Sequence, residues 1–500
     1  MLASYGLLNY RNYMKKLNIL LLLTSIFWYS CNTPIENKLL KPVTITGKVL
    51  DYVPNKTEGE ITFPKLCGEN KRETITFDSC GNFTCSSINN IPSDIRISIN
   101  KAYFIILAHP GDSIQIELVS NAPDFWKTIS INGQRATENR QIIKFQKQFR
   151  SNSIKSEELA EARDTKNEED FVSFMDSLRS KSMQKCEQFI QENNSNLEVE
   201  NWIKWHVNPM YYSNMYWYPI YRNELELKGS FYQFQEKLLP IKRDMLTATK
   251  SLNLFIAQYY FGSIKPIIDE ENNELFNQSK VTELKKDSVT IEEIINHSKG
   301  EFTKELVLSY WLSSKISTGN LKPYEYFIAT KKSEISTDFI FENLDQFYNS
   351  TKRRLTSGSK SIVFADNTKG QSIKTILDSI KESYKDNIIV LDCWGTYCGP
   401  CIANFPNTKQ LITDLKDQKI IFIFFCLNAS ADSERWTNLV NIHKLEGIHY
   451  CLDKEQSRDL KKILSIDGIP HYSIFDKSGI LRGNSDLHLE KSELIKLINE

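Results

Sequence analysis

The chain has 500 residues, of which 41% are hydrophobic and 25% charged, and its 62 basic residues balance 62 acidic ones. This length exceeds what one hydrophobic core usually supports, so several domains are expected. The balanced charge argues against a nucleic-acid-binding protein and against an acidic tail.

A basic segment followed by an apolar one stands near the N-terminus. From Met14 the sequence reads MKKLNILLLLTSIFWYSCN, which is typical of a secretory signal and short for a membrane-spanning helix. Ser30-Cys31 is similar to the lipobox of bacterial lipoproteins, in which the cysteine is lipidated and becomes the mature N-terminus. Residues 1–31 are therefore predicted to be a signal peptide, with an uncleaved anchor as the alternative. The mature chain is expected on the periplasmic side of a bacterial membrane, held there by the lipid.

Residues 42–120 alternate apolar and polar positions, as in VTITGKVLDY and DIRISINKAYFIILAHPGDSIQIEL. Turn signals such as SCGN separate these runs, so period-two strands joined by turns are predicted. We expect an N-terminal antiparallel β-sandwich. Because Cys67, Cys80 and Cys85 share this region, one disulfide among them is compatible with the sequence, although no pairing is specified.

Residues 136–350 change to helical spacing. Phe171, Phe174, Met175 and Leu178, for example, are spaced to lie on one helix face, which predicts a helical middle domain. The aromatic stretch WIKWHVNPMYYSNMYWYPIYRNE within it has two interpretations. It is either a platform on which a sugar or peptide stacks or an aromatic core between helices, and the core is favoured because aromatic side chains dominate burial.

Residues 361–500 alternate strand-like and helix-like segments, which predicts an α/β domain. NIIVLDCW and KIIFIFFCL are apolar runs suited to buried strands, and HYSIFDKSGILRG predicts two short strands. Cys398 and Cys401 follow the first of these strands and begin a helix. Functional sites of α/β sheets usually lie there, beyond the carboxyl end of a strand.

The segment Cys398-Gly399-Pro400-Cys401 can close a small disulfide ring at the start of this helix. Unpaired N–H groups and the helix dipole favour negative charge there, so Cys398 is expected to be a nucleophilic thiolate. Cys401, one turn further, is expected to be the more buried, resolving thiol. Pro400 removes an N–H that would have no helical partner. The pattern indicates dithiol–disulfide exchange.

The sequence WGTYCGPC resembles the active site of the thioredoxin superfamily, whose common form is Trp-Cys-Gly-Pro-Cys. Pro406 matches the proline that kinks the first helix of that family, and Pro470 in GIPHY matches its cis-proline. Asp392 matches a buried acid that moves protons at the resolving cysteine. With the lead-in from Trp394 to Tyr397, the last 140 residues resemble the membrane-anchored TlpA/ResA-type oxidoreductases most closely. A β-rich region and helices before such a domain are similar to the layout of lipoproteins of the Bacteroidetes.

Three positions depart from the TlpA/ResA pattern. Asn404 stands where these proteins usually carry glutamate, Asp392 where they tend to have asparagine, and Tyr397 where tryptophan is usual. The resemblance implies exchange with cysteines of protein substrates, without metal or organic cofactor. It favours a reductase, supplied with electrons by a membrane donor.

Metal chemistry is the main alternative for the cysteines. Cys398 and Cys401 could be half of a zinc site, but no second ligand pair follows at a suitable spacing. Together with Cys393 they have the spacing of a plant-type iron–sulfur protein, and His471 could complete a copper site. No metal is predicted, because Cys393 falls within an apolar strand.

Two alternatives from other functional classes remain. The chain could be mainly a ligand- or partner-binding lipoprotein with a secondary redox domain. A thiol peroxidase is disfavoured, because the cysteines are paired and the proline of the peroxidase motif is absent at Leu391.

Overall fold

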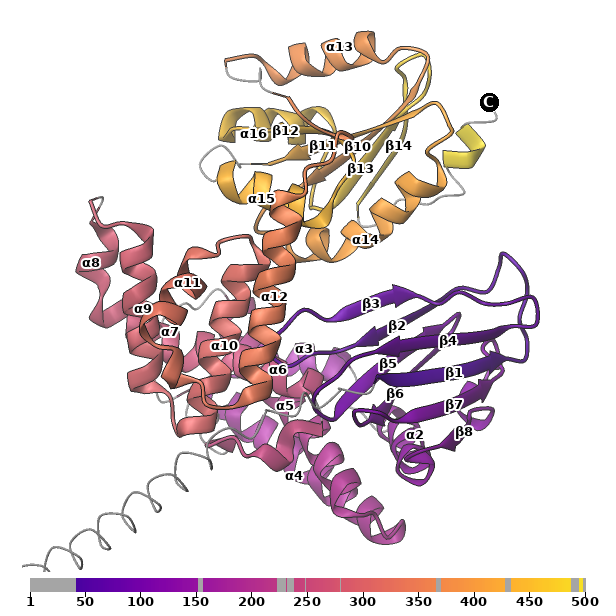
Figure 1. The fold of residues 1–500 in the computed structure, drawn as a ribbon, viewed down its shortest axis with the longest axis vertical. Coiled ribbons are helices and arrows are strands. Elements are labelled where there is room, and N and C mark those ends of the chain that lie inside the picture. Colours follow the sequence, from indigo (N-terminus) through magenta and orange to yellow (C-terminus); the bar gives the residue numbers. More distant parts are fainter. Residues whose placement is uncertain are drawn as a thin grey trace, which may run out of the picture.

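The computed structural model describes residues 42–151, 156–222, 231, 238–247, 249–278, 280–365, 370–427, 433–486 and 494–497. Within these ranges the chain is multidomain, with a β-rich N-terminal part, a helical middle part and a C-terminal α/β domain (Figure 1). The predicted signal peptide, including Cys31, lies outside the described residues. Across the described ranges every helix falls short of the length and apolarity that crossing a membrane requires.

The N-terminal part consists of two four-stranded sheets, ordered β4-β1-β7-β8 and β3-β2-β5-β6. Apolar residues from both sheets, among them Ile45, Ile61, Ile97 and Ile116, are fully buried in one hydrophobic core. The strands continue beyond residue 120. Their bounds are β1 (Val43–Val49), β2 (Gly59–Phe63), β3 (Lys71–Thr74), β4 (Asn82–Ser87), β5 (Ser93–Ile99), β6 (Ala102–Ala108), β7 (Ser113–Leu118) and β8 (Ser130–Gly133).

The prediction of a purely antiparallel N-terminal region was wrong for one strand pair. Strands β1 and β7 are parallel, with Ile45 opposite Ile114 and Gly47 opposite Ile116. The chain builds the second sheet between these two strands and then re-enters the first sheet in the same direction as β1. The alternation of apolar residues is the same in both kinds of pairing, so it does not specify strand direction.

The three cysteines of this region are not joined to one another. Cys67 and Cys85 are buried in different hydrophobic cores, and Cys80 is exposed in a turn. Although these cysteines are close in sequence, the fold does not bring any two of them to the short Cα distance that a disulfide needs.

The middle part is built from helices that enclose a second core. Three of the longer helices begin at side-chain caps, where Asn167, Asn196 and Thr282 accept a backbone N–H of the first turn. The helices are α2 (Ala136–Ser151), α3 (Ser156–Thr165), α4 (Glu168–Glu192), α5 (Leu197–Tyr221), α6 (Thr249–Tyr259), α7 (Lys265–Glu271), α8 (Asn273–Asn277), α9 (Glu283–His297), α10 (Glu301–Ser317), α11 (Lys322–Thr330) and α12 (Asp338–Thr356).

The aromatic stretch forms helix α5 and contributes mainly to this core. Trp202, Tyr212 and Tyr218 are almost completely buried, and only the last turns expose aromatic rings, at Trp217 and Tyr221. The interpretation as an aromatic core therefore describes most of the stretch.

The C-terminal domain has one six-stranded sheet, ordered β14-β13-β10-β11-β12-β9. The strands β10, β11, β12 and β9 are parallel, whereas β13 and β14 run antiparallel to them. The short elements β9, α13, β12 and α16 did not stand out in the sequence. The bounds are β9 (Ile362–Phe364), α13 (Ile373–Ser383), β10 (Ile388–Trp394), α14 (Gly399–Asp414), β11 (Ile420–Cys426), α15 (Ser433–His443), β12 (Gly447–Cys451), α16 (Lys454–Ile463), β13 (His471–Phe475) and β14 (Leu481–Asp486).

Helices cover both faces of this sheet. Val390 and Trp394 of β10 share one hydrophobic core with residues of α14 and α15, whereas Leu391 and Cys393 share another with residues of α13 and α16. Because successive side chains of a strand point to opposite faces, the even-numbered residues of β10 face α14. All seven residues of β10 are buried.

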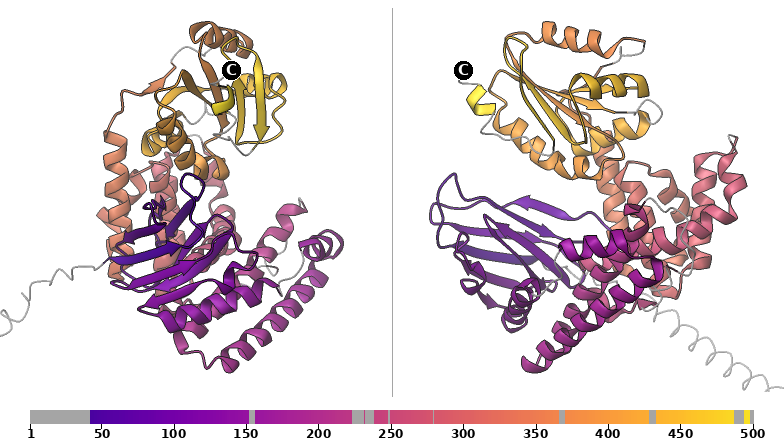
Figure 2. Two further views of the ribbon diagram at one scale, coloured as in Figure 1. Left: turned by 90° about the vertical axis from the view of Figure 1, so that its right-hand side faces the viewer. Right: turned by 180° about the vertical axis from the view of Figure 1, so that it is seen from behind.

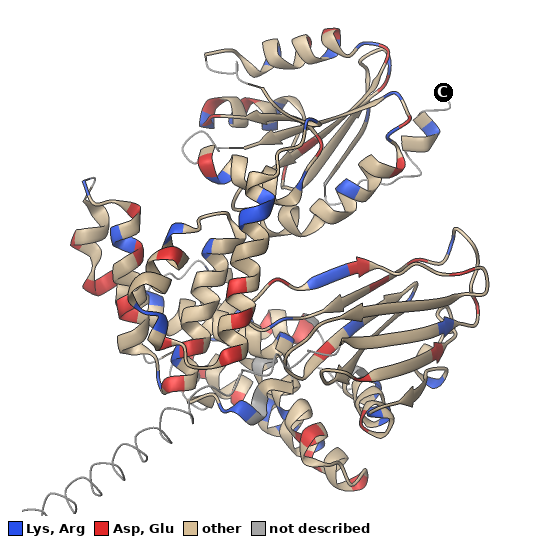
Figure 3. Ribbon diagram, in the orientation of Figure 1, with Lys and Arg blue, Asp and Glu red and all other residues tan. Residues whose placement is uncertain are grey.

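The C-terminal domain contacts both other parts of the chain (Figure 2). Helix α15 of this domain contacts α12 of the helical part. The helical and β-rich parts are joined in turn by Arg354 of α12, which forms two hydrogen bonds, of 2.8 and 2.9 Å, with the carboxylate of Glu69. Arg72 of β3 donates to the carbonyl oxygen of Ala403 on α14, at 3.4 Å. Acidic and basic residues are interspersed along all three parts (Figure 3), in keeping with the balanced charge.

The two environments within α5 can be tested by mutation. We expect Trp202→Ala to lower the free energy of unfolding by about 3–5 kcal/mol, because it leaves a cavity in the core. Trp217→Ala, at a position 43% exposed, should cost about 1 kcal/mol or less. Denaturant titration of the two variants checks this, and equal losses would contradict the assignment of α5 to the core.

Candidate active site

Cys398 and Cys401 form a disulfide at the start of helix α14. Cys398 is the N-cap residue, and its Sγ accepts the backbone N–H of Cys401 at 3.1 Å. Gly399 and Pro400 form the first helical positions, where a missing proline N–H costs no hydrogen bond. A backbone N–H of the first turn therefore points at the sulfur that is expected to carry negative charge.

The predicted cis-proline lies beside the disulfide. The Ile469–Pro470 peptide bond is cis, and the carbonyl oxygen of Ile469 is 3.6 Å from Cys398 Sγ. Tyr397, directly before the disulfide, is 60% exposed, whereas both cysteines are largely buried. The disulfide is therefore reached at one edge, between an exposed tyrosine and the proline loop.

One further residue of the predicted motif, Trp394, supports helix α14 from inside. Trp394 is fully buried at the end of β10, and its ring packs edge-to-face against Phe405, with centroids 5.1 Å apart. This ring contact attaches the helix that carries the disulfide to the end of the central strand. Pro406 lies within α14 at an exposed position.

Asp392 lies on the same sheet face as the disulfide, because it alternates with Val390 and Trp394 along β10. Its side chain is buried, and among the described residues its Oδ1 atom has no hydrogen-bond partner. Burial raises the pKa of this carboxyl group to about 7, because the charged form has lost its hydration. Asp392 can therefore take up or release a proton near neutral pH.

Cys393 and His471, the residues of the alternative metal sites, lie away from the disulfide. Cys393 and His471 are opposite each other on β10 and β13, on the face turned away from the disulfide. His471 Nε2 is 2.8 Å from Asn484 Oδ1, and burial raises the pKa of the Cys393 thiol. Cys393 and His471 therefore lie on the other face of the sheet from Cys398 and Cys401.

The sequence analysis missed one residue at this site. Tyr472 stands opposite Asp392 in the register of β10 and β13, and its Oη accepts a hydrogen bond of 2.7 Å from Asn404 Nδ2. Counting in steps of two from Pro470 would have placed Tyr472 on the disulfide face.

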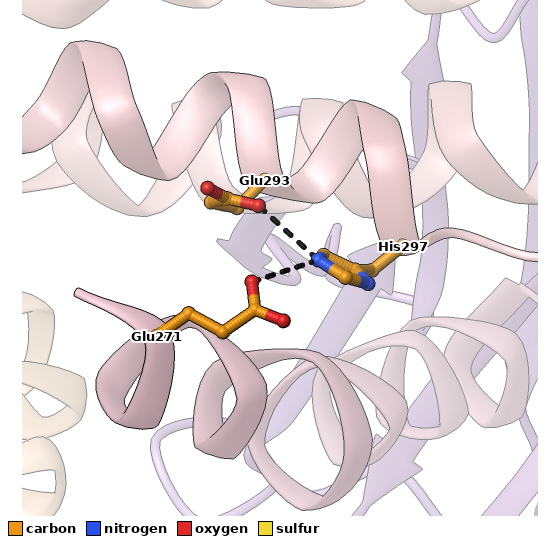
Figure 4. A group of neighbouring side chains, drawn as sticks. All are labelled: Glu271, Glu293 and His297. Atoms are coloured by element: carbon orange, nitrogen blue, oxygen red, sulfur yellow. Dashed lines mark hydrogen bonds and ion pairs between the residues drawn. The ribbon is translucent and has the colours of Figure 1, made fainter.

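Among the described residues, one group outside the α/β domain brings possible metal ligands together (Figure 4). His297 Nε2 lies 3.2 Å from Glu271 Oε2 and 3.1 Å from Glu293 Oε2. Glu293 and His297 are one turn apart on α9, and Glu271 ends α7. These are ordinary ion-pair distances between partly exposed groups, so a histidine bridging two carboxylates accounts for the arrangement and no metal site is inferred.

No protein-family model and no curated protein matches this chain. Among solved structures, it is similar to the thioredoxin domain of a thiol-disulfide oxidoreductase from Bacteroides vulgatus, with 19% identity, 24% of this chain and 84% of that chain covered, and a TM-score of 0.22. The chain is also similar to StoA from Bacillus subtilis, with 16% identity, 23% of this chain and 83% of that chain covered, and a TM-score of 0.20. For a secreted Mycobacterium tuberculosis disulfide oxidoreductase the identity is 16%, the match covers 24% of this chain and 84% of that chain, and the TM-score is 0.20. Each of these matches covers about a quarter of this chain.

The burial of Asp392 should appear as a pH-dependent cost in stability. The folded chain holds the Asp392 proton up to about pH 7, whereas the unfolded chain releases it near the ordinary pKa of 3.8. The folded state therefore loses stability as the pH rises from about 4 to about 7. We expect Asp392→Asn to be more stable than the natural chain above pH 7, by up to about 4 kcal/mol, and equally stable near pH 4.

Unfolding free energies of the oxidised protein, measured in denaturant at about pH 4 and about pH 8, check this expectation. Asp378→Asn, at an exposed position of α13, is the matched control and should leave the pH dependence unchanged. A difference between Asp392→Asn and the natural chain that is the same at both pH values would refute the buried-acid assignment.

Proposed function

We propose that this chain is an extracytoplasmic thiol–disulfide oxidoreductase that exchanges the Cys398/Cys401 couple with cysteines of protein substrates. The observation that carries the proposal is the placement of a disulfide at the N-terminus of α14, next to cis-Pro470. The N-cap sulfur is held by the N–H of Cys401, so reduction leaves a thiolate where the helix stabilises negative charge. The electrons reside on sulfur throughout, and no metal or organic cofactor is needed.

In the reductive direction, the Cys398 thiolate attacks one sulfur of a substrate disulfide, and a mixed disulfide forms. The other substrate sulfur leaves as a thiolate and takes a proton from solvent. The Cys401 thiol then loses its proton to the carboxylate of Asp392 and attacks the Cys398 sulfur. The Cys398–Cys401 bond forms, and the second substrate sulfur is released as a thiolate, so that two electrons have moved to the substrate.

Reduction is proposed as the working direction because the Gly399-Pro400 spacer is that of reductive thioredoxins. A membrane donor would return two electrons to the couple after each cycle. A lipid on Cys31 would hold the chain at the periplasmic side of the membrane, close to such a donor. Disulfide-containing or thiol proteins would be the partners.

Redox titration and trapping test the activity. For the chain from Asn32 onward, we expect a reduction potential of the Cys398/Cys401 couple near the roughly −270 mV of thioredoxin. Cys401→Ser should accumulate mixed disulfides with periplasmic proteins, because the resolving attack is lost. Cys398→Ser is the matched control and should trap none.

A potential near the roughly −120 mV of a strong oxidant would reverse the proposed direction. The absence of both a reversible couple and trapped partners would overturn the oxidoreductase proposal.

The lipid anchor has a separate test. In a bacterial host we expect the full chain to fractionate with membranes and to incorporate labelled palmitate, whereas Cys31→Ala should lose the label. A label that persists in Cys31→Ala would contradict lipidation at this residue.

A further inference from the structure

A tyrosine lies beside the buried acid, below the disulfide. Tyr472 is 2% exposed and stands directly opposite Asp392 in an antiparallel strand pair. Side chains in such pairs start about 5 Å apart on the same face of the sheet. The ring of Tyr472 therefore flanks the Asp392 carboxyl group, on the side of the sheet that α14 covers.

The far end of Tyr472 is fixed to the helix that carries the disulfide. Asn404 Nδ2 donates to Tyr472 Oη at 2.7 Å. Asn404 is three residues after Cys401, and residues three apart share a helix face. The hydrogen bond thus attaches β13 to α14 one turn beyond the resolving cysteine.

Among the described residues, no charged partner of Asp392 is present that would hold it ionised. Its neighbour on β11 is Phe424, and His449 stacks on the far side of Phe424 with centroids 4.7 Å apart. Burial lowers the pKa of His449 and of His443 on α15 to about 4, so both histidines are neutral at pH 7. Burial is the single cause of the raised pKa of Asp392. The contacts that exclude water from Asp392 therefore set the pKa of its carboxyl group.

Asn404 fits this arrangement for a chemical reason. Its amide donates to the phenol oxygen without adding charge, and Asn407 Nδ2 in turn donates to Asn404 Oδ1 at 2.9 Å. A glutamate at position 404, as in the TlpA/ResA pattern, would accept rather than donate and would bring a second negative charge toward Asp392. Asparagine at position 404 is therefore compatible with the buried acid on β10.

We propose that the Asn404–Tyr472 hydrogen bond is a latch that keeps Asp392 dry and thereby controls proton transfer between the Cys401 thiol and the Asp392 carboxylate. Both latch residues are positioning residues, because they act through Asp392. The inference rests on the proposed function. In the resolving step, the proton of Cys401 passes to Asp392 as the new bond between Cys401 and Cys398 sulfurs forms and the substrate thiolate leaves.

Opening the latch tests this role. In Asn404→Ala we expect water to reach Asp392 and its pKa to fall by about one unit, a tenfold loss of proton affinity. Carbon-13 NMR titration of the Asp392 carboxyl group in the reduced, full-length protein measures this directly. The acid limb of the pH–rate profile for the resolving step should move to lower pH by the same amount.

Two further variants complete the experiment. Tyr472→Phe keeps the ring and removes the hydrogen bonds of its hydroxyl group with Asn404 and Thr408. The pKa of Asp392 should shift in the same direction, which covers the case in which Asn404→Ala fails to fold. Gln410→Ala changes an exposed amide of α14 that bonds Asp414 instead, and it should leave the titration unchanged.

An Asp392 titration that is identical in the natural chain, Asn404→Ala and Tyr472→Phe would overturn the latch. Failure of the proposed function is a different outcome. The natural chain would then lack exchange activity, whereas the NMR titration would still report whether the latch controls Asp392.

Discussion

The burial of strand β10 on both faces is the constraint on which the rest of the site depends. All seven of its residues are enclosed between helices, so any polar side chain in the strand is removed from water. Asp392 is that side chain, and burial without a counter-charge is unfavourable for a carboxylate. The apolar neighbours on both faces offset this cost. The result is an acid that titrates near neutral pH beneath the end of the strand where the disulfide stands.

Helix α14 connects this constraint to the other parts of the chain. Its first turn carries the disulfide, its second turn bonds Tyr472 through Asn404, and its outer side receives Arg72 from β3. The C-terminal α/β domain is therefore connected to more than the helical part, because helix α14 also contacts the β-rich part.

Local signals in the sequence predicted the two cysteines and their position at the start of a helix. A Cys-Gly-Pro-Cys segment after an apolar strand carries its own helix start, because an N-cap residue and a proline in the first turn act within a few residues. The same holds for the long apolar runs of β10 and β11 and for the change from period two to helical spacing near residue 136. Short elements such as β12, whose five residues follow a helix almost directly, had too little pattern to be recognised.

Only the tertiary structure decided which side chains meet. The sequence alone did not distinguish the surroundings of Asp392, Cys393 and His471. In the pleated sheet, the Asp392 side chain lies on the face of the disulfide, whereas Cys393 and His471 lie on the opposite face. The bond between Asn404 and Tyr472 joins residues 68 positions apart. Such neighbours depend on strand order and register, which long-range packing sets. The sequence by itself thus determined a Cys-Gly-Pro-Cys segment at a helix start, and the fold determined the buried acid and the tyrosine beside it.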